Sequence, residues 1–372
     1  MNGTNLNEYR RNSNVQDQTD YFFVDKVNEK FPGFSKIIDK IKDVFIDAEV
    51  INSLDGRTRN ERIVPLGIVA SNLFLKKFKK GGIAFMMDSS TLCFASMARF
   101  YLKRRLFFNK YLIGAVLRYI KYYFIEKKVI RNFDKVIVVS EHDASYLEKK
   151  YNCSNVEVIS NGSDFPDLSK KKLKDFDFTL GILSYWGAGN HHDVDWFFAE
   201  YLPFLKKKYP NIKIITAGRA ADDYTLNLFQ QYDIEHLGEI DDLWDFFNKI
   251  DVYITTLRKE CGILNKVLDA MAHQKVVVGL EHNMYAFKSL KEGYFTYKNL
   301  EELIHHLETI KTNPELVKSK VNSSYNFISE HHRWVKNYQK MKAMIDTYHT
   351  EKFTNFETKS ATTSSANFTK VL

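Results

Sequence analysis

The sequence predicts an α/β protein with parallel sheets that is divided into two domains. Patterns typical of strands and patterns typical of helices alternate along most of the chain, which is the order that a parallel sheet requires. The 372 residues suit two domains of ordinary size, and 44% hydrophobic with 27% charged residues is the composition of a globular protein. The clearest strand–helix–strand unit lies between residues 252 and 280.

This unit has two β-branched runs on either side of a helix that follows a glycine. The runs are Val252–Leu257 and Val276–Leu280, and the helix between them begins after Gly262. The order predicts strand, helix and strand in one parallel sheet. A glycine lets backbone N–H groups approach a ligand closely, and a helix N-terminus attracts anions, phosphate above all.

The predicted helix has an apolar face and a polar face. Apolar side chains at helical spacing predict the face that packs on the sheet, namely Ile263, Val267, Ala270 and Met271. Asn265, Lys266 and Asp269 share the opposite face. On these residues alone, an ordinary α/β unit with a solvated polar face is a better interpretation than a ligand site.

The segment resembles the donor-site segment of glycosyltransferase family 4. The matching residues run Leu-Arg-x-x-x-Gly-Ile-x-Asn-Lys-Val-Leu-Asp-Ala-Met-Ala from Leu257 to Ala272, and three valines follow at 276–278. The resemblance implies the GT-B architecture, in which two Rossmann-like domains enclose a cleft and a C-terminal helix crosses back to the first domain. It also implies an enzyme that uses a nucleotide-activated sugar.

The resemblance assigns roles within this segment. Asp269 takes the place of the acid that binds the donor ribose, and the amides of Gly262 and Ile263 hold the diphosphate, with Asn265 beside them. As candidate catalytic residues, Arg258 and Lys266 neutralise the leaving phosphate.

One position departs from the family pattern. Many members carry another Glu eight positions before the ribose acid. Here that position is Cys261, and Glu260 precedes it. The residue that takes the role of this first acid is left open by the sequence.

Three further loops of the second domain are expected to contact the donor. The stretch from Ser184 to Trp196 resembles one bacterial subgroup of family 4, which implies that Gly187, Gly189 and Asn190 lie against donor phosphate or sugar. Arg219, at a predicted strand end, is a candidate phosphate-binding base, with an ordinary surface arginine as the alternative. Gly238 lies where backbone groups of the family meet the nucleotide base.

Two acids of the first domain are also candidates. Asp88 ends a predicted strand, where ligands bind in parallel sheets, and relatives often have Asp followed by Ser there. We therefore place Asp88 in the cleft as a third catalytic candidate, with a helix-capping role as the alternative. Glu126 also falls where relatives often have an acid; its alternative is a surface ion pair with Lys127 or Lys128.

Boundaries follow from these assignments and from composition. The predicted parts are a flexible N-terminus at 1–20, an acceptor-side Rossmann-like domain at 21–172, a nucleotide-sugar-binding Rossmann-like domain at 173–330, a crossing helix at 331–349 and a disordered tail at 350–372.

Positive charge is concentrated in the first domain. Residues 71–131 carry 14 basic and 2 acidic side chains, whereas residues 173–372 carry 24 basic and 26 acidic side chains. A helical tract from about Leu92 to Arg131 combines the bases with Phe and Tyr, which suits the headgroup layer of an anionic membrane. Nucleic acid is the competing partner, but no recognised nucleic-acid-binding motif accompanies the charge.

The remaining features concern location. No apolar run reaches the length of about 18 residues that spans a bilayer, and no signal peptide pattern opens the chain. Cys93, Cys153 and Cys261 lack the spacing of a metal site or a disulfide framework, which suits a reducing compartment. We expect a cytoplasmic protein held peripherally on the inner face of the cell membrane.

The predicted function is transfer of a hexosyl group from a nucleotide-sugar to a growing, lipid-linked bacterial surface polysaccharide such as O-antigen, capsule or exopolysaccharide. The resemblance implies retention at the anomeric carbon. We expect no metal and no cofactor, because the Asp193-x-Asp195 triplet lies inside a predicted helix. The alternatives are a GT-B-like sugar-nucleotide epimerase and a basic nucleic-acid-binding protein.

Overall fold

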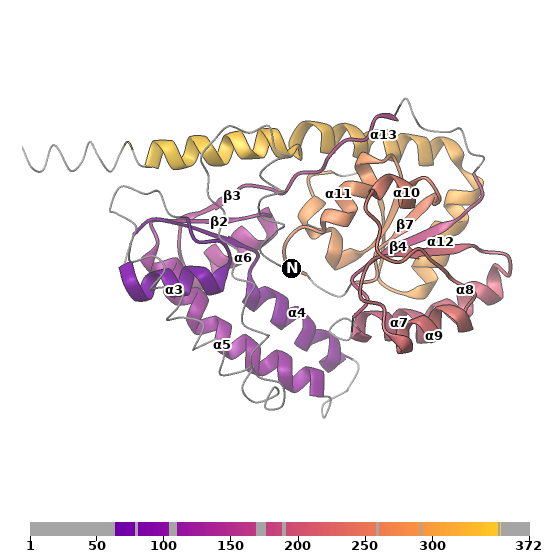
Figure 1. Cartoon of the computed structure of the whole chain (residues 1–372), viewed down its shortest axis with the longest axis horizontal. Coiled ribbons are helices and arrows are strands. Elements are labelled where there is room, and N and C mark those ends of the chain that lie inside the picture. The colour runs from indigo at the N-terminus through magenta and orange to yellow at the C-terminus, as the bar shows by residue number, and fades with distance from the viewer. Residues whose placement is uncertain are drawn as a thin grey trace, which may run out of the picture. The chain divides into compact units, whose positions relative to one another are not determined.

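The computed structural model describes residues 64–78, 81–103, 110–168, 176–187, 191–257, 260–290, 292–348 and 350. The expectations for residues 1–20 and for the tail beyond residue 350 lie outside these ranges. Within them the chain forms two parallel sheets flanked by helices, which confirms the predicted α/β class (Figure 1). We call residues 64–168 with the helix at 334–348 the first half, and residues 176–331 the second half.

In the first half, the described strands form a sheet in the order β1-β2-β3. These strands are β1 (Ile83–Met87), β2 (Lys135–Val138) and β3 (Val156–Val158), and both pairings are parallel. The central strand β2 is buried from Val136 to Val138 because helices cover it. The helices are α3 (Ile68–Phe78), α4 (Ser90–Lys103), α5 (Lys110–Asn132) and α6 (Glu141–Tyr151).

In the second half, six parallel strands pair in the order β6-β5-β4-β7-β8-β9. They are β4 (Leu180–Leu183), β5 (Ile214–Ala217), β6 (Glu235–His236), β7 (Val252–Ile254), β8 (Val276–Leu280) and β9 (Phe295–Tyr297). Counted from β4, this is the 3-2-1-4-5-6 order of the Rossmann fold. The strand order reverses between β4 and β7, and ligands of such sheets bind outside the carboxyl ends of the strands at that point.

Helices cover both faces of this sheet. They are α7 (His191–Glu200), α8 (Leu202–Lys208), α9 (Asp223–Gln231), α10 (Leu243–Phe247), α11 (Asn265–Ala272), the 3₁₀ segment η3 (Glu281–Phe287), α12 (Leu300–Thr312) and α13 (Pro314–His331). Val252 and Ile254 of β7 enter one core cluster, and Tyr253 between them enters the other. Side chains alternate between the faces of a strand, so a strand covered on both faces is apolar throughout.

Several helices begin where the sequence supplies a polar cap. Ser140, Asp222 and Asn299 accept hydrogen bonds from the first turns of α6, α9 and α12. Helix α11 starts after Leu264, which provides no side-chain cap. The predicted buried face of α11 is confirmed, because Val267, Ala270 and Met271 are fully buried.

The C-terminal helix crosses back to the first half, as predicted. Residues 334–348 are helical, and Met341, Met344, Ile345 and Tyr348 pack on Ile83, Ile137 and Ile159 of the first sheet (Figure 1). The crossing is tight at Gly162, where a side chain would overlap the backbone of Trp334. Among the described residues, no helix is both long and apolar enough to cross a membrane.

Glu126 lies inside the first half and makes no surface ion pair. It is fully buried on α5 and accepts hydrogen bonds from the Thr91 N–H (2.9 Å), the Thr91 hydroxyl (2.5 Å), the Ser89 hydroxyl (3.2 Å) and the Tyr151 hydroxyl (3.1 Å). Burial raises its pKa, although these hydrogen bonds oppose the shift. The surface-pair interpretation is therefore wrong, because the side chain turns inward to hold the start of α4.

We expect Glu126→Ala to lower the free energy of unfolding by about 3 kcal/mol, because several buried donors lose their acceptor. Urea denaturation measures the change. Arg131→Ala, at an exposed position of the same helix, is the control and should cost less than about 0.5 kcal/mol. Equal stabilities of the two variants would contradict the structural role of Glu126.

Candidate functional site

The donor loops predicted from sequence gather at the carboxyl edge of the second sheet. Backbone hydrogen bonds join them: the Trp186 N–H donates to the Arg219 oxygen (3.0 Å), and the Gly218 N–H donates to the Gly238 oxygen (2.8 Å). Gly218 has φ of +124°, and a side chain there would overlap the Ser184 oxygen. The loops after β4, β5 and β6 thus form one surface beside the strand-order reversal.

The predicted donor-site residues of these loops differ in burial and backbone conformation. Gly187 is buried after β4, and Gly238 has a positive φ of +72° that favours glycine. Arg219 is exposed at its predicted strand end. Gly189, Asn190 and Arg258 lie outside the described residues.

Asp269 lies where the two halves meet. Its carboxylate accepts a hydrogen bond from the Ser163 hydroxyl of the first half (2.7 Å). Burial raises its pKa to about 6, and Asp164 adds to the shift, while Ser163 and Lys266 oppose it. One turn earlier on α11, the Asn265 oxygen accepts a hydrogen bond from the Asn161 side chain (2.7 Å). The polar face of α11 therefore contacts the chain that follows β3.

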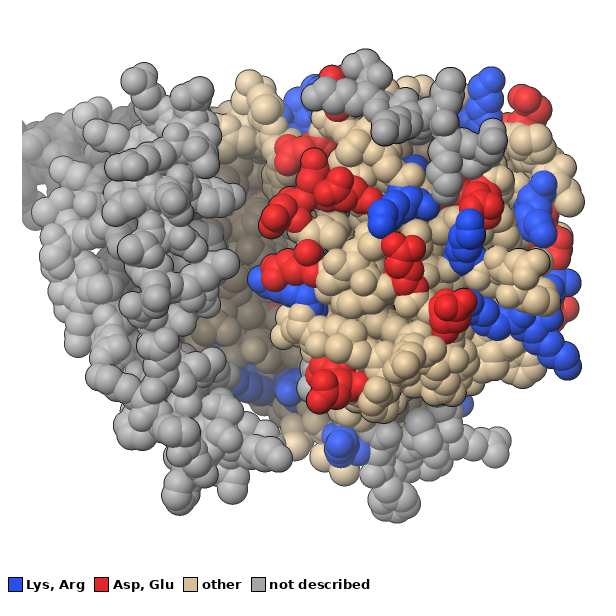
Figure 2. Space-filling model, turned by 45° about the vertical axis from the view of Figure 1, so that its right-hand side comes forward, with Lys and Arg blue, Asp and Glu red and all other residues tan. Residues whose placement is uncertain are grey.

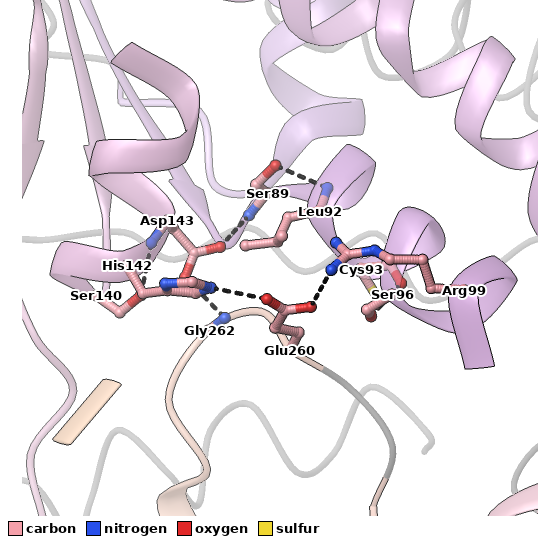
Figure 3. Close-up of polar contacts among 10 residues, drawn as sticks. All are labelled: Ser89, Leu92, Cys93, Ser96, Arg99, Ser140, His142, Asp143, Glu260 and Gly262. Atoms are coloured by element: carbon pink, nitrogen blue, oxygen red, sulfur yellow. Dashed lines mark hydrogen bonds and ion pairs between the residues drawn. The ribbon is translucent and has the colours of Figure 1, made fainter. Parts of the chain in front are cut away.

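Gly262 faces a carboxylate of the first half. It has φ of +69°. A Cβ atom added there would lie 3.3 Å from the Cβ of Asp88. The Gly262 N–H donates to Oδ2 of Asp143 (2.8 Å), as Figure 3 shows. Asp143 is fully buried and also accepts the Ser89 N–H at Oδ1 (2.8 Å). Burial raises the pKa of Asp143, and the neighbouring charge of Asp88 adds to the shift.

Glu260 and Cys261 point to different surroundings. Glu260 lies 3.2 Å from Arg99 and 3.4 Å from His142, both in the first half (Figure 3). Burial disfavours its ionisation, but the hydrogen bond with His142 and the charge of Arg99 outweigh burial and lower its pKa. Cys261 is buried, and its thiol lies 3.8 Å from the Asp88 carboxylate. Of Glu260 and Cys261, Glu260 is therefore the residue that forms ionic contacts with the first half.

Sequence reasoning brought Gly262, Asp269 and Asp88 into one region and missed their partners. Asp143, His142, Arg99 and Ser163 were not among the candidates. A capping pattern, Ser140 followed three residues later by Asp143, marked the start of α6. It carried no information on the partner of the Asp143 carboxylate, because that partner is 119 residues away along the chain.

The described residues contain no group of three or more His, Cys, Asp or Glu side chains placed to hold a metal ion. Lys266, in the first turn of α11, lies close enough to influence Asp269.

Comparison with solved structures confirms the predicted GT-B architecture at the level of the fold. Residues 178–313 match the family described as "Glycosyl transferases group 1", and this segment contains α11 with its preceding loop. No curated protein matches the chain in sequence.

Three solved structures illustrate the similarity. Sucrose-phosphate synthase from Thermosynechococcus elongatus has a TM-score of 0.66 at 12% identity, covering 86% of this chain and 81% of its own. A variant of S. aureus TarM, in complex with fondaparinux, alpha-GlcNAc-glycerol and UDP, has a TM-score of 0.60 at 14% identity, covering 81% and 59%. Anabaena Alr3699/HepE in complex with UDP has a TM-score of 0.56 at 14% identity, covering 81% and 82%.

The raised pKa of Asp269 predicts a pH-dependent difference in stability. The folded state holds a proton up to about pH 6, whereas the unfolded carboxyl releases it near its ordinary pKa of 3.8. The folded state therefore loses stability as the pH rises between these values, by up to about 3 kcal/mol. Asp269→Asn removes this loss, so the variant should gain stability over the wild type between pH 4 and pH 7.

Urea denaturation at a series of pH values measures this difference. Asp223→Asn, at an exposed position of α9, is the control and should follow the wild type. Parallel stability curves for the wild type and Asp269→Asn would show that the acid is not perturbed.

Proposed function

We propose that the chain is a glycosyltransferase that moves a sugar from a nucleotide-sugar donor to an acceptor. One observation carries the proposal: in the segment that matches the family, the Gly262 turn and Asp269 lie together beside the strand-order reversal of a Rossmann-type sheet. A diphosphate suits the start of α11, where amides without a side-chain cap offer donors. Asp269 suits the vicinal hydroxyls of a ribose.

The chemistry asks for stabilisation of a leaving anion. The bond between the anomeric carbon and the diphosphate oxygen breaks, the nucleoside diphosphate keeps the electron pair, and an acceptor hydroxyl forms the new bond as it loses its proton. Amides of Gly262 and Ile263 with the charge of Lys266 would stabilise the departing phosphate. We extend the proposal to hexosyl transfer with retention, without a bound metal or cofactor.

The similar structures suggest which donor to try first. TarM and HepE are both described in complex with UDP. Thermal unfolding of the full chain with UDP-, GDP- and ADP-sugars should show stabilisation by one nucleotide class, because a ligand of the folded state raises its melting temperature. Release of nucleoside diphosphate that depends on an acceptor would support transfer. Conversion of the sugar without an acceptor would indicate an epimerase instead.

Asp269→Ala should weaken binding of the stabilising nucleotide by about 2 kcal/mol, roughly 30-fold, because the ribose loses a charged acceptor. Calorimetry on the folded variant measures this loss. Asp223→Ala removes the same charge from an exposed position of α9 and should bind like the wild type. Unchanged affinity in Asp269→Ala would remove Asp269 from the site.

We further propose that the acceptor is lipid-linked and that the first half binds an anionic membrane. The support lies on α5, where Ile113, Leu117, Ile120 and Phe124 follow one another at helical spacing and are between 50% and 65% exposed. Exposed cations, Arg118 and Lys121, accompany this apolar stripe, and the acid of the helix, Glu126, is buried. Such a helix suits an interface of apolar chains and anionic headgroups.

On the face of the second half that Figure 2 shows, Lys and Arg side chains are interspersed with Asp and Glu. This contrast supports different roles for the two halves. The second half would bind a soluble donor, and the first half would bind an acceptor at a membrane surface. Growth of a bacterial surface polysaccharide on a lipid carrier, at the inner face of the cell membrane, is the process that we propose.

Sedimentation with vesicles tests the membrane proposal. The full chain should bind vesicles that contain phosphatidylglycerol, release in high salt, and ignore pure phosphatidylcholine, since each cation contributes about 1 kcal/mol at an anionic surface. Leu117→Ser and the pair Arg118→Gln with Lys121→Gln should each weaken binding. The pair Lys207→Gln with Lys208→Gln on α8 removes the same charge from the second half and should not. Equal loss in both pairs would refute α5 as the contact.

A further inference from the structure

The Gly262 amide, which the proposed function assigns to the donor's diphosphate, already has an anionic partner. Oδ2 of Asp143 accepts its hydrogen at 2.8 Å. Carboxylate and phosphate oxygens are both acceptors that a backbone N–H binds as anions, so the two groups compete for one donor. The contact also shows that the Gly262 N–H points toward a position occupied by a carboxylate.

Asp143 is fixed in its place by its own half of the chain. It lies in the first turn of α6, where its N–H donates to the Ser140 hydroxyl (3.0 Å), and that hydroxyl donates back to its carboxylate. Its other oxygen accepts the Ser89 N–H (2.8 Å). Three hydrogen bonds within the first half thus hold Asp143, and it is fully buried. The contact therefore breaks most readily by movement of the loop that carries Gly262.

Two more residues of the same loop contact the first half. Glu260 meets Arg99 (3.2 Å) and His142 (3.4 Å), and the Cys261 thiol meets Asp88 (3.8 Å). Figure 3 shows Glu260 and Gly262 side by side against α4 and α6. Residues 260–262, which we call the latch, thus contact the first half at several points. Asp143 contacts the latch at the Gly262 amide, which the proposed function assigns to the donor.

We propose that Asp143 is an internal competitor for the donor's phosphate: its carboxylate occupies the Gly262 amide in the empty protein, and donor binding requires this contact to break. Asp143 then sets donor affinity, because part of the binding free energy is used to release it. It also couples the arrival of the donor to the separation of the two halves at residues 260–262. The inference rests on the proposed function, since it assigns the Gly262 amide to a nucleoside diphosphate.

Calorimetry with UDP, and with GDP and ADP where UDP does not bind, tests the competition. Asp143→Asn keeps the shape of the side chain and removes its charge, so the variant should bind the nucleoside diphosphate about three- to tenfold more tightly than the wild type. Affinity for the nucleoside without phosphates should not change, because the competition concerns the phosphate alone. An equal gain for both ligands would indicate a general change of the site and overturn the inference.

Glu141→Gln is the matched control. Glu141 lies two residues away in the same first turn of α6 and carries the same charge, but it is exposed. Its variant should bind the nucleoside diphosphate within about twofold of the wild type. A gain equal to that of Asp143→Asn would mean that net charge, and not the contact with Gly262, limits binding, which contradicts the inference.

A second experiment uses the native thiols and does not depend on the fold of Asp143→Asn. The thiol of Cys93 on α4 lies close enough to Cys261 in the latch to raise the pKa of the Cys261 thiol. In a Cys153→Ser background, oxidation by diamide should join them: each thiol loses a hydrogen, and diamide is reduced to the hydrazine. With the latch locked, the protein should lose nucleoside diphosphate binding and regain it on reduction. A locked protein that binds as well as the reduced one would overturn the inference.

The outcomes separate the inference from the proposed function. If the wild type binds a nucleoside diphosphate and Asp143→Asn binds it no better, the competition is wrong and the transferase proposal stands. If neither protein binds any nucleoside diphosphate, both proposals fall.

Discussion

The reversal of strand order between β4 and β7 is the constraint on which the site depends. Strands that run in one direction end at one edge, so the loops after β4, β5, β6 and β7 meet there although up to about 80 residues separate them in sequence. The loops can approach only where side chains are absent or small, which is why Gly218 lies against the Ser184 oxygen. The same edge places Gly262 and α11 against the first half. Sheet topology thus decides which residues share the site, before any side chain does.

Much of this arrangement follows from local sequence. The central strands β7 and β8 of the second sheet are buried on both faces, so each appears as an unbroken apolar run, and they could be assigned on either side of α11 from that pattern. The polar and apolar faces of α11 follow from helical spacing, and Val267 and Met271 are buried as expected. The crossing of the C-terminal helix followed from the resemblance to a family. Local patterns are informative here because burial on both sides leaves few alternatives.

The partners of the site residues could not be predicted in this way. Glu126 carries the local pattern of a surface acid, with two lysines after it, yet it is buried because Thr91 and Tyr151 converge on it from other elements. Asp143 has the pattern of a capping residue, yet it bonds Gly262 across the halves. These contacts depend on how separate elements pack, and no spacing along a single element encodes that. Asp269 was predicted from a family pattern to bind the donor ribose, but its hydrogen-bond partner Ser163 was not predicted.

The charges at the junction of the halves indicate that binding of an anion there would require a rearrangement. Asp88, Asp143, Glu260 and Asp269 all lie near the meeting point of the halves, and burial raises the pKa of Asp143 and Asp269. A raised pKa means that the surroundings disfavour the charge, so these acids are held at a cost in the empty protein. A diphosphate would add negative charge to the same region. The junction can accept it only if acids withdraw or cations approach, and the loop that carries Gly262 also carries Glu260, which is bound to Arg99 and His142. Under the proposed competition, movement of this single loop would free the Gly262 amide for phosphate and would also release Arg99 and His142 from Glu260.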